Sequence, residues 1–268
     1  MSMDAFDSSF PQDQAHGLRR LFAQTRVRLV PVVSNPHMAF GGVLLERLCT
    51  ALAEQDARVL LVDAAERSPQ PQELAVISLA ECIERLSPKV SYMAARGLPL
   101  RFVDAHGSTA GFLQAIVDAA PETDVLLVHA SASEQCRLFA RQTICLPTKP
   151  LLLADDRPAS VTHAYAAMKL MTLRAKTMVY HLLLGAAPSS PRAGRIAEQL
   201  AGCADIFLGS VLQGWTQIDP AGNATDAVPR ALQHLAATVL QPVSLETEAR
   251  FPVKSPMPVN WPAIGAVN

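Results

Sequence analysis

The chain has 268 residues, of which 50% are hydrophobic and 18% are charged, and its formal net charge is -1. This balance excludes an intrinsically disordered chain and gives no electrostatic footprint for binding nucleic acid. The length suits one large α/β domain or two small ones. Because no run of ~18 apolar residues and no secretion signal is found, we expect a cytoplasmic protein.

The five cysteines show no C-x-x-C pairing and fall mostly within predicted helices or strands. We interpret them as small apolar core residues of a protein in a reducing compartment. They are Cys49, Cys82, Cys136, Cys145 and Cys203.

Residues 1–26 are predicted to form an N-terminal arm with one short helix, Gln12–Gln24. Its apolar residues lie at helical spacing, flanked by two arginines. The apolar stripe consists of Ala15, Leu18, Leu21 and Phe22. A helix this short is marginal in water unless it docks on another surface.

Residues 27–63 predict one strand-loop-helix-strand unit of a parallel sheet. The two strands are Val27–Val33 and Arg58–Asp63, and the helix is Val43–Glu54. The first loop, Ser34–Gly42, lies where such a fold usually binds its ligand, because free N–H groups and the helix dipole point there.

Apolar strands continue to alternate with amphipathic helices down the chain. The further helices expected are Ser78–Leu86, a helix from the Gly107-Ser108-Thr109 turn to Ala119, Ser133–Gln142, Pro158–Leu173, Arg192–Ala201 and Val228–Leu240. The further strands expected are Leu98–Asp104, Asp124–Ala130, Pro150–Ala154, Met178–Leu184 and Ile206–Leu212. This alternation predicts a single α/β domain over 27–240, with a mostly parallel twisted sheet and helices on both faces. The five prolines in 241–268 predict an irregular tail.

The phosphate-binding pattern G-x-x-x-x-G-K-[ST] is absent from the sequence. No lysine precedes Lys89, so the first loop and its helix offer no lysine to a phosphate. Gly41-Gly42 could still bind an anion through backbone N–H groups alone.

Four stretches resemble the MinD/ParA-type P-loop ATPases, and within them the flagellar number regulators FlhG and FleN. Asp13–Arg19 reads D-Q-A-H-G-L-R and matches the subfamily signature D-Q-A-x-x-L-R. Ser34–Leu48 is similar to the phosphate loop and its helix, and Asp124–Ser133 to the Walker B strand. Arg157–Ala166 is similar to the subfamily stretch P-E-P-T-S-I-T-D-A-Y.

The departures from the family pattern fall on its charged groups. Pro36 and Gly41 stand at the two lysines of the phosphate loop, and Gly42 stands at the magnesium-binding threonine. His129 replaces the Walker B aspartate, while Asp63 keeps an acidic position. Since phosphoryl transfer depends on lysine and magnesium, the resemblance implies a pseudo-ATPase without a bound cofactor. The alternative is a working ATPase that binds ATP and magnesium through backbone groups and Asp63.

The resemblance also implies a partner for the N-terminal helix, namely FlhF, a GTPase of the signal-recognition-particle type. The residues carried over for activating that GTPase are Asp13, Gln14, Ala15, Leu18, Arg19 and Phe22. Gln14 would orient the attacking water, and Leu18 and Phe22 would anchor the helix in a groove. The domain itself would contact flagellar basal-body or regulatory proteins, which could recruit it to the cell pole or membrane. The alternatives are a helix packed on its own domain, or a binding module without a flagellar role.

His37, Asp63 and His129 all follow or end predicted strands, so they could converge at one sheet edge. Two histidines and a carboxylate could bind a metal; the alternative is three drifted surface residues around an emptied pocket.

Two further expectations concern the pocket and the assembly. The Ser34–Gly42 loop could enclose a phosphate-sized cavity, or it could have collapsed with Met38 and Phe40 filling the space. Because ATP bridges dimers of that family, we expect a monomer unless apolar surface has replaced the nucleotide.

The last helix, Val228–Leu240, has too few basic residues for a membrane-binding face and is expected to pack on the sheet or a partner.

Overall fold

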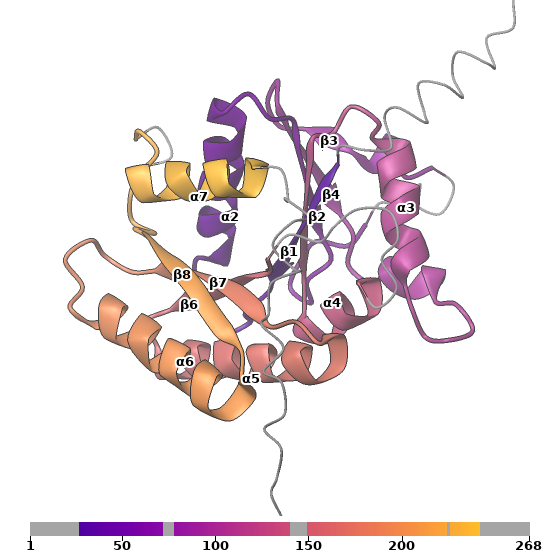
Figure 1. The fold of residues 1–268 in the computed structure, drawn as a ribbon. Coiled ribbons are helices and arrows are strands. Elements are labelled where there is room, and N and C mark those ends of the chain that lie inside the picture. Colours follow the sequence, from indigo (N-terminus) through magenta and orange to yellow (C-terminus); the bar gives the residue numbers. More distant parts are fainter. Residues whose placement is uncertain (1–26, 72–77, 140–148, 224–225, 242–268) are drawn as a thin grey trace, which may run out of the picture.

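The computed structural model describes residues 27–71, 78–139, 149–223 and 226–241. Eight strands form one sheet in the order β3-β4-β2-β5-β1-β6-β7-β8 (Figure 1). All neighbouring strands are parallel except β3, which pairs antiparallel with β4. The strands are β1 (Arg28–Val33), β2 (Val59–Asp63), β3 (Glu84–Arg85), β4 (Val90–Ala94), β5 (Val125–Ala130), β6 (Leu151–Asp155), β7 (Val179–Gly185) and β8 (Val211–Ile218).

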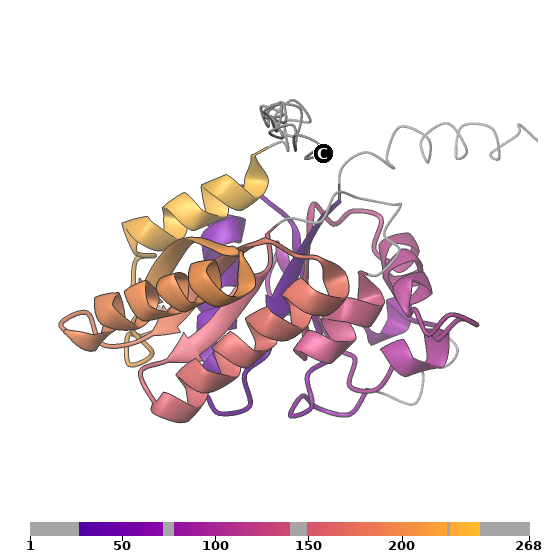
Figure 2. The same ribbon diagram turned by 60° about the horizontal axis from the view of Figure 1, so that its bottom comes forward.

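Helices cover both faces of this sheet (Figure 2), so the predicted α/β fold class is confirmed. One layer consists of α2 (Gly41–Glu54) and α7 (Arg230–Leu240). The opposite layer consists of α3 (Ala110–Ala119), α4 (Ala132–Leu138), α5 (Pro158–Ala175) and α6 (Arg192–Leu208). Successive strand residues point to opposite faces. Val30 and Val32 of β1 therefore pack under α2, whereas Leu29 and Val33 pack on the other layer.

Pro31 lies in β1, at the centre of the sheet, where a proline would normally break a ladder hydrogen bond. Arg28 N–H donates to Asp124 O at 2.9 Å, on the β5 side. Because backbone direction alternates, residue 31 faces the β6 side instead. The pairing with β6 begins only opposite Val32, so the missing N–H of Pro31 leaves no partner unpaired in the ladder.

Two predicted elements before α3 are wrong. The predicted helix Ser78–Leu86 is a 3-10 turn, Ala80–Cys82, followed by β3, because Leu79, Cys82 and Ile83 imitate helical spacing over a single turn. The predicted strand Leu98–Asp104 is a second 3-10 turn, Pro99–Phe102, whose proline occupies its first position. The sequence analysis also missed β4, which pairs in parallel with β2.

The junction between α6 and β8 also differs from the prediction. The helix continues past Ala201 to Leu208 and therefore contains Ile206 and Phe207, which had been assigned to a strand. It ends at Gly209, whose φ of 60° is the left-handed conformation that glycine adopts without strain. Because that turn takes up the following residues, the strand begins only at Val211.

The remaining predicted elements within the described residues are present, with ends shifted by a few residues. Of the cysteines, Cys49, Cys82 and Cys136 are buried and Cys203 is half-buried, all as free thiols. No helix among the described residues is long and apolar enough to cross a bilayer. Predictions for 1–26 and 242–268, and for Cys145, lie outside the described residues.

His181 of β7 generates a prediction about acid stability. Its Nε2 lies 2.9 Å from Thr216 Oγ1, and burial, with the charge of Lys149, lowers its pKa to about 4. The unfolded chain takes up this proton near pH 6.5, so folding stability should fall as the pH drops from about 6.5 to about 4, by roughly 2 kcal/mol. Urea unfolding across this range measures the effect.

His181→Gln should flatten this part of the stability curve. His234→Gln changes an exposed histidine on α7 and should leave the curve as in wild type. Parallel curves for wild type and His181→Gln would contradict the assignment.

Candidate functional site at the carboxyl edge of the sheet

The carboxyl ends of four central strands meet at one edge of the sheet, where α/β folds bind ligands. Asp63 at the end of β2 lies opposite His129 of β5 in the strand register. The loop Ser34–Gly42 follows β1, and Asp155 ends β6. The edge therefore brings together most of the residues selected from the sequence.

The loop after β1 folds into a turn that uses its own N–H groups. Asn35 Oδ1 accepts the N–H of His37 at 3.1 Å, and Asn35 O accepts the N–H of Met38, also at 3.1 Å. Ser34 N–H donates to Ala130 O at 2.9 Å. Because a phosphate loop works through free N–H groups, these three bonds remove donors that a phosphate would need.

The Asn35 side chain also ties this loop to the neighbouring strand and helix. Its Nδ2 donates to Leu153 O at 2.8 Å, to Ser160 O at 2.9 Å and to Ser160 Oγ at 3.0 Å. Ser160 is fully buried in the first turn of α5, and its Oγ also accepts the N–H of Asp155 at 2.9 Å. One buried amide therefore joins β1, β6 and α5.

Met38 is 7% exposed and packs in the core beneath α2, whereas Phe40 is 58% exposed. Of the two alternatives for the loop, the collapsed one, in which Met38 and Phe40 fill the space, is therefore found at Met38 but not at Phe40. At Gly41 and Gly42 an added Cβ would meet no atom within 4 Å, and neither residue has a positive φ. Nothing around these two glycines requires glycine, unlike a backbone that must wrap closely around a phosphate.

A second set of contacts holds the outer part of the loop. Arg157 donates from Nη2 to His37 O, and its Nη2 and Nε lie 2.8 and 2.9 Å from Asp155 Oδ2. The His37 ring packs edge-on against His163, with centroids 5.5 Å apart. Burial, followed by the charge of His37, lowers the pKa of His163.

Asp63 and His129 form a hydrogen-bonded pair, with Asp63 Oδ1 and His129 Nδ1 2.7 Å apart and both side chains largely buried. The hydroxyl of Ser68 donates to the same oxygen, and the Tyr92 hydroxyl donates to Asp63 Oδ2 at 3.4 Å. Burial alone would raise the pKa of Asp63. The hydrogen bond and charge of His129, with help from Ser68 and the Ala65 N–H, outweigh burial and lower that pKa below its usual value.

The hypothesis of a metal site at His37, Asp63 and His129 is not matched by the geometry. His37 faces His163 rather than the other two residues. Within the described ranges, no group of three or more His, Cys, Asp or Glu side chains could hold a metal.

Of the residues bonded around the Asp63 carboxylate, the sequence analysis identified Asp63 and His129 but missed Ser68 and Tyr92. Tyr92 was missed because β4 was not predicted, although Val90 and Tyr92 alternate as strand residues do.

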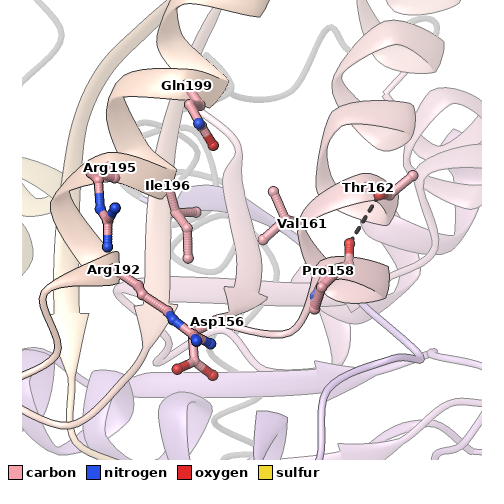
Figure 3. Close-up of a pocket in the computed structure, with 8 residues that line it drawn as sticks. All are labelled: Asp156, Pro158, Val161, Thr162, Arg192, Arg195, Ile196 and Gln199. Carbon is pink, nitrogen blue, oxygen red and sulfur yellow. Dashed lines mark hydrogen bonds between the residues drawn. The ribbon is translucent and has the colours of Figure 1, made fainter.

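An open groove of about 450 Å³ lies beside this edge, between the first turns of α5 and α6 (Figure 3). Val161 and Ile196 provide apolar surface, and Arg192, Arg195 and Asp156 provide charge. Pro158, Thr162 and Gln199 complete the lining. The two arginines were not selected from the sequence, although their i,i+3 spacing at a helix start was an available signal. Guanidinium groups at this place could bind a carboxylate or phosphate.

Two features of this edge bear on whether it could bind a nucleotide. Pro36 contributes no charge at the loop, and Asp63 already has partners on both carboxylate oxygens. The residues assigned to partner activation, from Asp13 to Phe22, lie outside the described residues. The described edge is therefore a hydrogen-bonded and packed structure whose loop after β1 offers no lysine to a triphosphate.

No family model matches this sequence, and no curated protein matches it. Solved structures do resemble the fold. A putative plasmid partition protein from Borrelia burgdorferi, bound to AMPPNP, superposes with a TM-score of 0.55 at 8% identity, over 81% of this chain and 97% of that one. MinD from Aquifex aeolicus superposes with a TM-score of 0.52 at 13% identity, and the match covers 82% of this chain and 99% of that one. An ATP complex of McdA from Cyanothece superposes with a TM-score of 0.52 at 14% identity, and the match covers 81% of this chain and 93% of that one.

These similarities assign the fold of MinD/ParA-type P-loop ATPases to the chain. Two of these similar structures hold ATP or AMPPNP, as their names state. At identities this low the likeness extends to the fold alone, and the chemistry must come from the residues described above.

The Asp63–His129 pair leads to a prediction about ionisation. In His129→Ala, burial is no longer outweighed, so the pKa of Asp63 should rise above its ordinary value. Carboxyl-carbon NMR of Asp63 across a pH titration measures this shift. In the wild type, the stabilisation from the lowered pKa is present above about pH 4 and disappears as the pH falls through the pKa of the folded state.

Ser68→Ala removes one of the smaller contributions and should raise the pKa of Asp63 less than His129→Ala does. An unchanged pKa in His129→Ala would show that the pair does not hold the carboxylate in its charged form.

Proposed function

We propose that this protein is a degenerate relative of the MinD/ParA-type ATPases that regulates flagellar assembly or flagellar number through protein contacts. Its own pocket does not turn over ATP. Its N-terminal helix stimulates a partner GTPase of the signal-recognition-particle type, similar to FlhF. The protein acts in the cytoplasm and reaches the cell pole or membrane through its partners.

The proposal that the pocket does not turn over ATP rests on the hydrogen bonds and packing of the loop after β1. Asn35 uses loop N–H groups for a turn and anchors the loop to Leu153 and Ser160. Met38 is packed in the core, and Asp63 is bonded to His129. A triphosphate would have to displace these contacts without gaining a lysine in return.

The heptapeptide Asp13–Arg19 supports the second part, because it resembles the activator signature of the flagellar number regulators. In this proposal Gln14 orients the water that attacks GTP on the partner. Leu18 and Phe22 lie on the apolar side of the helix and enter a groove of that GTPase. Asp13, Ala15 and Arg19 complete the contact surface.

GTP turnover by an FlhF-type GTPase tests this proposal directly. Adding the full-length protein should accelerate single-turnover hydrolysis by on the order of tenfold or more, because a supplied water-orienting group lowers the barrier of the chemical step. Gln14→Ala should abolish most of this acceleration while leaving the binding of the two proteins measurable.

Gln24→Ala is the matched control, because it removes the same kind of side chain beyond the heptapeptide and should stimulate as wild type does. No stimulation by the wild type, or equal stimulation by Gln14→Ala, would instead favour a binding module without this role.

A further inference from the structure

The two edges of the sheet differ in how they are protected. The β3 edge has two residues, Glu84 and Arg85, and both are charged and exposed. The β8 edge has eight residues, Val211–Ile218, with the sequence VLQGWTQI, and none is charged or a proline. Short, charged edges resist pairing with further strands, whereas long uncharged edges invite it. The β8 edge thus has the properties of a strand that pairs on both sides.

The direction of the backbone shows which groups of β8 are open. Val211 N–H donates to Met178 O at 2.7 Å, and Ile218 O accepts the N–H of Ala186 at 3.0 Å, both toward β7. The pairing register shifts between Tyr180 and His181, so Gly214 rather than Gln213 lies opposite His181 and the alternation starts again there. Counted back from Ile218, the N–H and C=O groups of Trp215 and Gln217 point away from β7. Among the described residues, β8 is the last strand of the sheet on this side.

Exposed apolar side chains gather beside this edge. Of the ten large apolar side chains that are exposed in the described residues, six lie where α5 and α6 end and where β7 and β8 run: Leu173, Met178, Ile206, Phe207, Val211 and Trp215. Phe207 is 70% exposed, yet it follows Leu200 by two helical turns and so continues the buried stripe of α6. The stripe therefore extends beyond the surface that covers it.

The C-terminal segment of this chain starts from the same end of the sheet. Helix α7 follows β8, and Gln233 O in its first turn accepts from Gln55 Nε2 at 2.7 Å, just before β2 begins. Since α7 also packs against β1, Leu240 lies toward the edge where the strands begin. Residues 242–250 can span about 30 Å when extended. The sheet distance from β1 to β8 is three strand spacings, or about 14 Å, so residues 251–261 can reach any part of the β8 edge.

The sequence of that segment has the pattern an added edge strand requires. Of the six odd positions in 251–261, five are apolar and one is Ser255; the apolar ones are Phe251, Val253, Met257, Val259 and Trp261. The three prolines of the segment occupy even positions, namely Pro252, Pro256 and Pro258. In an edge strand, alternate residues point their N–H groups away from the sheet, and proline is tolerated there.

We propose that residues 251–261 of this chain add to β8 as a ninth strand. The odd residues turn their backbone groups toward β8 and place their side chains on one face, over the apolar surface around Phe207 and Trp215. The even residues turn their missing N–H groups to solvent. The prolines then leave this new edge unable to pair further, so the tail both covers β8 and ends the sheet.

A pair of proline variants can separate the role of the odd positions from a general effect of the tail. The double variant Val253→Pro, Val259→Pro removes two N–H groups that would face β8. Hydrogen exchange of the Trp215 and Gln217 amides, measured by NMR, should then accelerate by at least about tenfold. Lys254→Pro with Asn260→Pro adds the same number of prolines at even positions and should leave that exchange unchanged. Far-UV circular dichroism establishes that both variants keep the fold.

Equal acceleration in both variants, or no acceleration in either, would overturn the proposal. Light scattering gives a further readout. A monomer is expected at all concentrations, whereas protection of β8 that rises with protein concentration together with a dimeric mass would mean that a second copy covers the edge, which also overturns it.

Discussion

The hydrogen bonds of Asn35 are the interaction on which the carboxyl edge depends. A single amide, 8% exposed, holds the loop after β1 against β6 and the first turn of α5. If this amide stayed buried without these acceptors, its N–H groups would be unsatisfied, at a cost of about 1–3 kcal/mol for each unsatisfied group. The loop is thus fixed from within the protein, in the place where a nucleotide fixes the loop of an ATPase.

The acidic side chain at this edge is likewise held by other groups of the protein. In a hydrolase of this fold, lysine and magnesium would balance the charge of phosphates and acidic side chains. Here Asp63 has hydrogen-bond partners in His129 and in the hydroxyl groups of Ser68 and Tyr92. The result is a hydrogen-bonded, largely buried pair that keeps the ends of β2 and β5 together.

Much of the fold could be predicted from the sequence because buried parallel strands are continuous apolar runs. The strands β1, β2, β5, β6 and β7 were identified in this way, and their order along the chain implied the parallel sheet. The errors lie where the pattern is short or ambiguous. Near Ser78 one turn of helical spacing imitated a helix, and near Ile206 strand-forming residues ended a helix whose stop signal was Gly209.

The site was less predictable, because its key bonds connect residues far apart in the sequence. Asp63 and His129 were identified from their positions at strand ends, but which groups pair with them depends on the neighbouring strands. The role of Asn35 had no sequence signal beyond its place in the loop, since its partners lie more than 100 residues away. His37 was expected near Asp63, yet its ring lies against His163, because the Asn35 turn and Arg157 direct the loop toward α5.

The central claim is that the protein's own side chains have replaced the nucleotide at this edge. An equilibrium titration of the full-length protein with fluorescent ATP, with and without magnesium, tests it most directly. The account predicts no saturable binding below about 1 mM, equivalent to less than about 4 kcal/mol of binding free energy, and no effect of magnesium. Saturable, magnesium-dependent binding at micromolar concentrations would contradict it and would identify a working ATP site with a non-standard loop.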